Sequence, residues 1–424
     1  MSRLAIDRAP AVALPRRFLL SAPPWGMLAG VLLAVDADRL LQSRWQPGTL
    51  ALVHVFTLGV LGNAMFGSVL QFLPAAAGVR LRGLRWGGVL HGLLNLGSAF
   101  LVAGLHAGWR GGLVTAGVLL PAAFVLLAAM TLPGVWEAGM QRLLRAGLAA
   151  ALGFALLAAL LGGGLVLALG GVLAWPVALP TLADVHAGWG LLGWIVLLLA
   201  SVAPVVMPMF QGTAAPPAKL QASWLAGAVA ALLGGAWLHL WRGEAAVLRM
   251  APAALAGTFA AASLWLQWRA PRPRRGPLWW SWRGGLLALL AAALAWLFDP
   301  GSALRAAALA LLVALPWLVN GMALEIVAFL GWIELHRRVG RGVQLPGVQR
   351  LLPERDKWRV LHAQWLAAAL LFAAVMLSGR GGPAAWLARA AGAGQLLAWW
   401  LLWRALRGVR RRSHRFLSNL ESFR

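Results

Sequence analysis

The chain has 424 residues, of which 61% are hydrophobic and only 12% are charged, and its formal net charge is +25. It contains no cysteine, which excludes disulfides, iron–sulfur clusters and cysteine nucleophiles, and it contains no tyrosine. No basic segment is long enough to form a soluble domain, so the positive charge favours contact with a lipid bilayer and argues against nucleic-acid binding.

Apolar runs of about 18 residues or more recur along the whole sequence, which is typical of transmembrane helices. Because only helices satisfy their own backbone hydrogen bonds in lipid, we expect an all-α polytopic membrane bundle of about 12 transmembrane helices. A single transmembrane domain, residues 18–406, would lie between an N-terminal tail, 1–17, and a basic C-terminal tail, 407–424. The predicted spans are residues 18–36, 48–77, 87–107, 112–132, 146–172, 184–210, 222–241, 250–268, 284–298, 303–335, 360–379 and 388–406.

The ninth and tenth predicted spans differ from the others in length. The ninth, 284–298, is short, and the tenth, 303–335, is long with Pro316 near its start. Proline removes a backbone donor and interrupts a helix, so we expect a kink or tilt in the tenth span.

The distribution of basic residues predicts the orientation in the membrane. If both termini are cytoplasmic, 29 of the 37 lysines and arginines fall in cytoplasmic segments, as the positive-inside rule requires. The richest stretches are 269–275, 337–359 and 404–415, where we expect contact with anionic lipid head groups. These features predict a multi-pass protein of the bacterial inner membrane with cytoplasmic N- and C-termini.

The second and sixth predicted spans each carry a histidine near the same end. One reads HVFTLGVLGNAMFGSVLQFLP from His54, and the other reads HAGWGLLGWIVLLLASVAPVVMPMFQ from His186. Ionisable side chains are costly inside a membrane and commonly mark functional sites, so both histidines are candidate metal or cofactor ligands. Gly190 and Gly193 share the His186 face and would leave room for a flat group such as haem, and Asp184 would orient an imidazole. Alternatively, the histidines only bond to neighbouring helices and the glycines only permit close packing.

Other intramembrane polar residues give weaker candidates. His91 and His362 lie towards the predicted cytoplasmic side and are secondary candidates for metal binding. Asn320 and Glu325 lie within the tenth span, where a buried carboxyl group indicates a proton or ion relay. The alternative for Glu325 is a salt bridge or hydrogen bond that fixes the register of its helix.

Short strings suggest an internal repeat. The second, sixth and tenth spans are four apart, and the repeat predicts three pseudo-symmetric four-helix units with these spans around the centre. The second span also has a stripe of small and polar residues suited to close helix packing, Gly59, Asn63 and Gly67. The repeated strings are Leu61-Gly62-Asn63, Leu192-Gly193-Trp194 and Leu330-Gly331-Trp332.

Three blocks, RFLLSAPPWGMLAGVLL and the two histidine-led stretches, resemble bacterial membrane proteins distantly related to haem–copper oxidase subunit I, including the NnrS group. This resemblance implies a twelve-helix, pseudo-threefold fold, binding of haem or copper, and a link to the response to nitric oxide stress. It also implies that His54 matches the haem-ligand position of the second helix. His186 falls on the helix that supplies a metal ligand in the oxidases.

The sequence departs from the oxidases at the second metal site. The oxidases use a His-His pair on helix 7 and histidines within helix 10, whereas here the seventh span has only His239, at its end, and the tenth has Asn320 and Glu325. No cluster of three histidines is evident, and without tyrosine the oxidases' Tyr-based electron and proton donor does not exist. We therefore do not expect oxygen reduction or conventional nitric oxide reduction, and whether the protein is an enzyme stays open.

Three functions remain. The first is a membrane protein that binds haem, with copper as a further option, through His54 and His186, and has a redox, gas-response or metal-homeostasis role. The second is a cofactor-free secondary transporter or permease, with Glu325, Asn320, Gln71 and Gln211 along its route. The third is a structural subunit of a respiratory membrane complex with a stoichiometric partner protein. The sequence favours the first.

Overall fold

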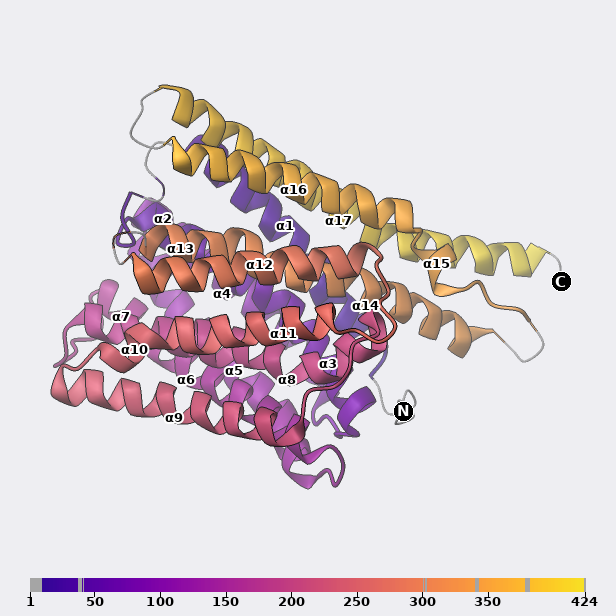
Figure 1. The fold of residues 1–424 in the computed structure, drawn as a ribbon, viewed down its shortest axis with the longest axis horizontal. Coiled ribbons are helices and arrows are strands. Elements are labelled where there is room, and N and C mark those ends of the chain that lie inside the picture. The colour runs from indigo at the N-terminus through magenta and orange to yellow at the C-terminus, as the bar shows by residue number, and fades with distance from the viewer. Residues whose placement is uncertain are drawn as a thin grey trace. The chain divides into compact units, whose positions relative to one another are not determined.

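The computed structural model describes residues 10–36, 40, 42–299, 301, 303–339, 343–377 and 382–422. All regular secondary structure in these ranges is helical, which confirms the all-α prediction (Figure 1). The elements are α1 Ala13–Val35, α2 Pro47–His54, η2 Val55–Gly62, α3 Asn63–Ala77, η3 Leu84–Trp86, α4 Gly87–Ala107, α5 Arg110–Glu137, α6 Arg142–Leu169, α7 Leu179–Ala187, η4 Gly188–Val196, α8 Leu197–Gln211, α9 Ala218–Arg242, α10 Ala246–Ala251, η5 Pro252–Gly257, α11 Thr258–Trp268, α12 Pro277–Phe298, α13 Ala303–Leu309, η7 Ala310–Ala314, α14 Leu315–Arg338, α15 Val348–Leu351, α16 Glu354–Met376 and α17 Gly382–Ser422.

Eleven helical stretches within the described ranges are long and apolar enough to cross a membrane, and they correspond to the first eleven predicted spans. We number these stretches span 1 to span 11 in chain order. Span 2 joins α2, η2 and α3; span 6 joins α7, η4 and α8; span 8 joins α10, η5 and α11; span 10 joins α13, η7 and α14. The chain is thus an integral, multi-pass membrane protein.

The twelfth predicted span, 388–406, lies within α17, a single helix of 41 residues. Arg389, Gln395 and several tryptophans make this stretch less apolar than the other spans. At 1.5 Å per residue the helix is about 60 Å long, about twice the thickness of the hydrocarbon core. The predicted C-terminal tail, 407–424, is therefore helical as far as Ser422, and part of α17 must leave the hydrocarbon region.

The structure moves several predicted boundaries, among them the starts of the first and ninth spans. Helix α1 starts at Ala13, so the end of the predicted N-terminal tail, 1–17, is helical, whereas residues 1–9 lie outside the described ranges. The ninth span is not short, because α12 starts at Pro277 and includes the tryptophans that precede residue 284. The Trp282 side chain is fully buried and its indole N–H donates to the Leu318 carbonyl oxygen at 3.0 Å, so this tryptophan is a packing residue rather than part of a loop.

Spans 2, 6 and 10 share two features beyond their spacing of four. In the most apolar 18-residue window of spans 2, 6 and 10, 72%, 67% and 72% of the residues are buried, respectively. In the other eight spans, the buried share of the corresponding window is 22–50%. Each also contains a π-helical segment, η2, η4 or η7, and span 8 contains a fourth, η5. The irregularity expected at Pro316 is thus a π-helical segment that ends two residues before it. Such segments widen a helix locally and are frequent at functional sites.

The described residues fall into two units. Unit 1 comprises Leu70–Arg274 and Leu286–Ala310. Within it, α4, α5 and α6 pack in succession, and α6 also packs against η4 and α8 (Figure 1). The turn after α8 needs glycine, because Gly212 has φ of +72° and a Cβ there would lie 1.9 Å from the Arg272 carbonyl oxygen.

Unit 2 comprises Pro10–Val69, Arg275–Gly285 and Leu311–Arg424, and α17 is its main packing element. Helix α17 packs against α16, α1 and α14 (Figure 1). Glycines allow the backbones of α1 and α17 to touch: a Cβ on Gly30 would lie 2.5 Å from the Leu396 nitrogen, and one on Gly392 would lie 2.5 Å from the Ala34 nitrogen. Close backbone approach at small residues is how membrane helices associate without a hydrophobic driving force.

Candidate functional site

His54 is the last residue of α2 and directly precedes the π-helical segment η2. Its Nδ1 atom lies 2.7 Å from the Leu50 carbonyl oxygen, one helical turn earlier. A carbonyl oxygen only accepts hydrogen bonds, so Nδ1 must carry the proton, and in the neutral ring the lone pair lies on Nε2. The backbone thus fixes both the tautomer and the orientation of this imidazole.

His186 occupies a similar place in span 6, two residues before the π-helical segment η4. Its Nδ1 atom lies 2.9 Å from the carbonyl oxygen of Ala158 on α6. The close approach depends on Gly162, where a Cβ would lie 2.6 Å from the His186 Cε1 atom. As for His54, the bond to a carbonyl places the proton on Nδ1 and the lone pair on Nε2.

The glycines near the two histidines serve mainly to admit aromatic rings from the preceding span. A Cβ on Gly59, in η2, would lie 2.6 Å from the Trp25 side chain of α1. A Cβ on Gly193, in η4, would lie 2.5 Å from the Phe154 side chain of α6. Gly193 therefore does not leave room for a cofactor, whereas a Cβ on Gly190 would meet the Ala158 Cβ only at 3.9 Å.

The small-residue stripe of span 2 packs as the sequence predicts. Gly67 faces α1, since a Cβ there would lie 2.8 Å from the Pro15 carbonyl oxygen, and Gly59 faces the same helix. The buried Asn63 side chain donates to the Gly59 carbonyl oxygen at 2.8 Å, which keeps its amide group satisfied within the helix. The third repeated string, from Leu330, lies well beyond η7, whereas the first two strings overlap η2 and η4, so the three strings do not fall at equivalent places in their spans.

Asp184 lies beside an imidazole of another span. Its carboxylate lies 3.6 Å from the Nε2 atom of His239, on α9. The Nδ1 atom of His186 itself is oriented by the Ala158 carbonyl oxygen.

The secondary histidines have different surroundings. His91 lies in α4 and is partly exposed, and His362 lies in α16 with an exposed side chain. The His362 ring is 5.5 Å from the Trp358 ring and 5.7 Å from the Trp365 ring of its own helix, as in an interfacial aromatic cluster. Within the described ranges, no group of three or more His, Cys, Asp or Glu residues is placed to hold a metal ion.

Glu325 forms a buried ion pair with Lys357 of α16, with 2.6 Å between Oε1 and Nζ. The side chains of Glu325 and Lys357 are only 16% and 6% exposed. Asn320 is also buried, and its Nδ2 atom has no hydrogen-bond partner among the described residues. The sequence interpretation missed Lys357 because it placed this residue in a loop, whereas α16 starts three residues earlier, at Glu354. The sequence did offer one signal for a special role of Lys357, because the chain has only one other lysine, Lys219.

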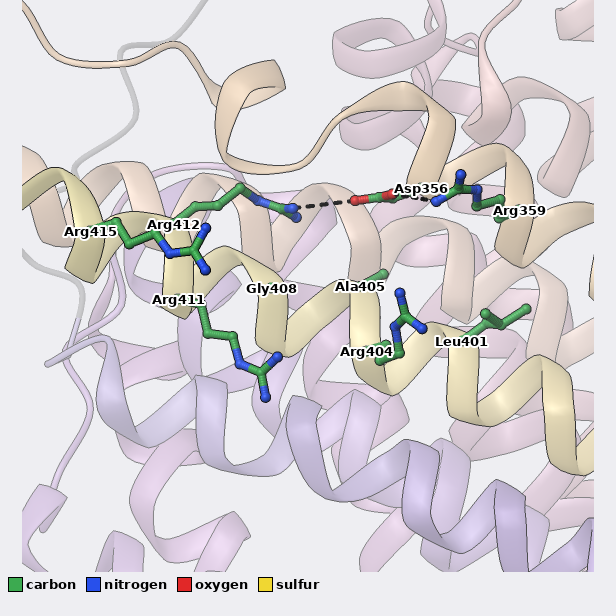
Figure 2. Close-up of a pocket in the computed structure, with 9 residues that line it drawn as sticks. All are labelled: Asp356, Arg359, Leu401, Arg404, Ala405, Gly408, Arg411, Arg412 and Arg415. Carbon is green, nitrogen blue, oxygen red and sulfur yellow. Dashed lines mark hydrogen bonds and ion pairs between the residues drawn. The ribbon is translucent and has the colours of Figure 1, made fainter.

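Arginines gather around a pocket between α16 and α17, with a volume of about 410 Å³. Figure 2 shows the Asp356 carboxylate between the guanidinium groups of Arg359 and Arg412. The sequence identified the basic stretches, but it did not show that 337–359 and 404–415 come together at one pocket. A signal exists, because residues 404, 408, 411, 412 and 415 follow the spacing of one helix face. The lining residues are Asp356, Arg359, Leu401, Ala405, Gly408, Arg404, Arg411, Arg412 and Arg415.

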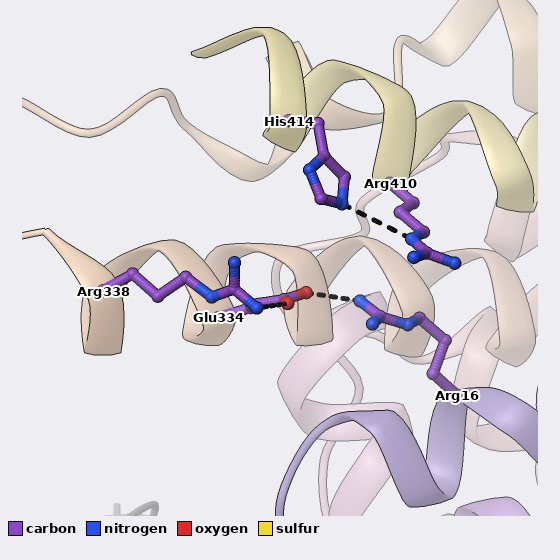
Figure 3. A network of polar contacts seen from close by, with 5 residues as sticks. All are labelled: Arg16, Glu334, Arg338, Arg410 and His414. Atoms are coloured by element: carbon purple, nitrogen blue, oxygen red, sulfur yellow. Dashed lines mark hydrogen bonds and ion pairs between the residues drawn. The ribbon is translucent and has the colours of Figure 1, made fainter. Parts of the chain in front are cut away.

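Glu334, near the end of α14, is held by two arginines. It accepts from Arg16 of α1 and forms a 2.9 Å ion pair with Arg338, one turn further along its own helix (Figure 3). On α17, the Arg410 Nε–H donates to the His414 ring at 3.4 Å. The Glu334 network joins helices of unit 2 and gives this carboxylate a structural role.

No protein-family model matches the sequence, and no curated protein matches it either.

Proposed function

We propose that this integral membrane protein binds haem, with the imidazoles of His54 and His186 as iron ligands. The observation that carries the proposal is the shared anchoring of the two rings: each Nδ1 atom donates to a backbone carbonyl oxygen, at 2.7 Å for His54 and 2.9 Å for His186. Histidines that bind metals almost always donate their other ring N–H in this way, because the bond fixes the tautomer and the direction of the ligating nitrogen.

The position of the histidines along their helices also supports the proposal. His54 lies one residue and His186 two residues before a π-helical segment, each in one of the three most buried spans. π-Helical segments are uncommon and are frequent at functional sites, where they redirect side chains. The same association of histidine and π segment occurs in unit 1 and in unit 2, which fits a repeated ligand position.

The described residues fit haem better than a copper centre. Haem iron takes one or two protein ligands, whereas no group of three potential metal ligands exists within the described ranges. Bound haem would supply one-electron chemistry or gas binding. The chain's own backbone carbonyl oxygens hold the imidazole tautomers. Since the sequence lacks tyrosine, the proposed role is electron transfer, gas response or haem homeostasis rather than oxygen reduction.

Titration of the purified, haem-free chain with haem tests this proposal. We expect a Soret band at saturation, and a weaker or shifted band in His54→Ala and in His186→Ala. His362→Ala is the matched control, because its exposed ring stacks on its own helix, and it should keep the wild-type spectrum. Each ligand variant should lower the haem stoichiometry or change the iron spin state. Unchanged spectra in both ligand variants would contradict the proposal.

The Glu325–Lys357 pair favours a second candidate, a secondary transporter coupled to protons or ions. A largely buried carboxylate and a buried lysine form a pair that can exchange a proton. Asn320, on the same helix as Glu325, has a buried amide nitrogen without a hydrogen-bond partner among the described residues. In liposomes with an internal pH dye, Glu325→Gln should abolish coupled flux. Glu334→Gln removes a carboxylate from the same helix and is the control. Flux that survives Glu325→Gln would exclude this mechanism.

A further inference from the structure

We propose that the arginine pocket between α16 and α17 binds the phosphate group of an anionic phospholipid. Five arginines and a single carboxylate, Asp356, are among the residues that line the pocket. Its volume of about 410 Å³ falls within the range of small-molecule sites, about 300–1,000 Å³. Arginine is the side chain best suited to bind phosphate, because its planar guanidinium group donates two parallel hydrogen bonds to the phosphate oxygens.

Asp356 organises the pocket without neutralising it. Its two oxygens lie 3.6 Å from Arg359 and 3.3 Å from Arg412, and the Arg412 Nε–H also donates to the Leu351 carbonyl oxygen at 2.6 Å. These contacts hold Arg412 in a defined conformation against α16 (Figure 2). Among the described residues, Arg404, Arg411 and Arg415 have no ion-pair partner, so an excess of positive charge remains for an anion.

The pocket lies where α17 changes from apolar to basic. On its apolar side it is lined by Leu401 and the buried Ala405, and on its other side by arginines. The Arg404 guanidinium lies 4.9 Å from the centre of the Trp400 ring. Tryptophan and arginine together mark the depth of lipid head groups. An apolar wall beside a basic one fits a lipid, with its glycerol and acyl part against Leu401 and its phosphate against the arginines.

Arg404→Gln and Arg415→Gln are the test variants, since neither side chain has an ion-pair partner within the described residues. Arg407→Gln is the matched control: it removes the same charge from the same helix, its guanidinium lies over Trp403 at 4.4 Å, and it does not line the pocket. The purified full-length chain in neutral detergent is titrated with phosphatidylglycerol, with phosphatidylcholine or with inorganic phosphate, and bound lipid is counted by native mass spectrometry.

We expect saturable binding of phosphatidylglycerol, at least about ten-fold tighter than binding of phosphatidylcholine. Each pocket variant should weaken it about ten-fold, and Arg407→Gln less than three-fold. A general attraction between the lipid and a basic surface would change the lipid affinity about five-fold per arginine, wherever that arginine lies. Equal losses of affinity in all three variants would therefore overturn the proposal. Displacement of the lipid by millimolar inorganic phosphate would also overturn it, since soluble phosphate would then be the ligand. Both readouts are independent of haem.

Discussion

Replacing Lys357 with methionine would leave the Glu325 carboxylate in a buried position without its counter-ion. Methionine is chosen because it keeps most of the volume of the lysine stem and removes only the charge. The ammonium and carboxylate groups are 2.6 Å apart, and their side chains are 6% and 16% exposed. Lys357→Met therefore tests the electrostatic pairing rather than the packing of α16.

The expected loss follows from the geometry. At 2.6 Å and an effective dielectric constant of about 20, the gross attraction is about 6 kcal/mol. Desolvation of both groups offsets much of this attraction, but removing one partner of a buried pair typically costs about 3–5 kcal/mol, because the remaining charge has no compensation. We expect Lys357→Met to lower the free energy of unfolding by that amount. The double variant Lys357→Met/Glu325→Gln should recover most of it.

The measurement is the unfolding free energy of the detergent-solubilised protein, followed by circular dichroism during titration with a denaturing detergent. The two single variants and the double variant form a cycle that isolates the coupling between the side chains. A loss below about 1 kcal/mol in Lys357→Met, or a double variant as unstable as the sum of the single variants, would refute the inferred pairing.

Two glycine substitutions test close contacts, each against a control. Gly162→Ala would force the His186 ring away from the Ala158 carbonyl oxygen, so we expect about ten-fold weaker haem binding, measured by absorption titration. The control is Gly153→Ala on the same helix, where the added methyl group meets open space and haem affinity should not change. Equal effects would contradict the proposed positioning of His186. Gly30→Ala would place a methyl group against the α17 backbone and should lower stability by about 1–3 kcal/mol in thermal unfolding. Gly227→Ala, which meets open space, should raise it by about 0.4–1 kcal/mol, and a stabilising Gly30→Ala would show that α1 and α17 do not pack as described.

The sequence predicts the fold well because lipid leaves the backbone few alternatives. Runs of apolar residues placed the first eleven spans to within a few residues at most ends. The main error in this set, the start of span 9, arose because tryptophan is common both at membrane interfaces and in packed cores. Only tertiary contacts show that Trp282 belongs to the core, through its bond to the Leu318 carbonyl oxygen.

The candidate site was predictable only in part. The histidine-led stretches made His54 and His186 candidates, but the acceptors that orient their rings could not be predicted from the sequence. For His186 the acceptor is a carbonyl oxygen 28 residues away on another helix, and every residue offers such an oxygen. The pairing of Lys357 with Glu325 was missed for a related reason. An ion pair between two helices forms only when both residues lie at the same depth in the membrane, and an error of one helical turn in the start of either helix changes which residues meet.

The absorption spectrum of the full-length protein, purified in detergent from cells supplied with haem, tests the proposed function most directly. Ligation by His54 and His186 predicts a Soret band in the wild-type protein that is lost in the double variant His54→Ala/His186→Ala. A colourless wild-type preparation, or a double variant with the wild-type spectrum, would contradict haem binding at these two histidines.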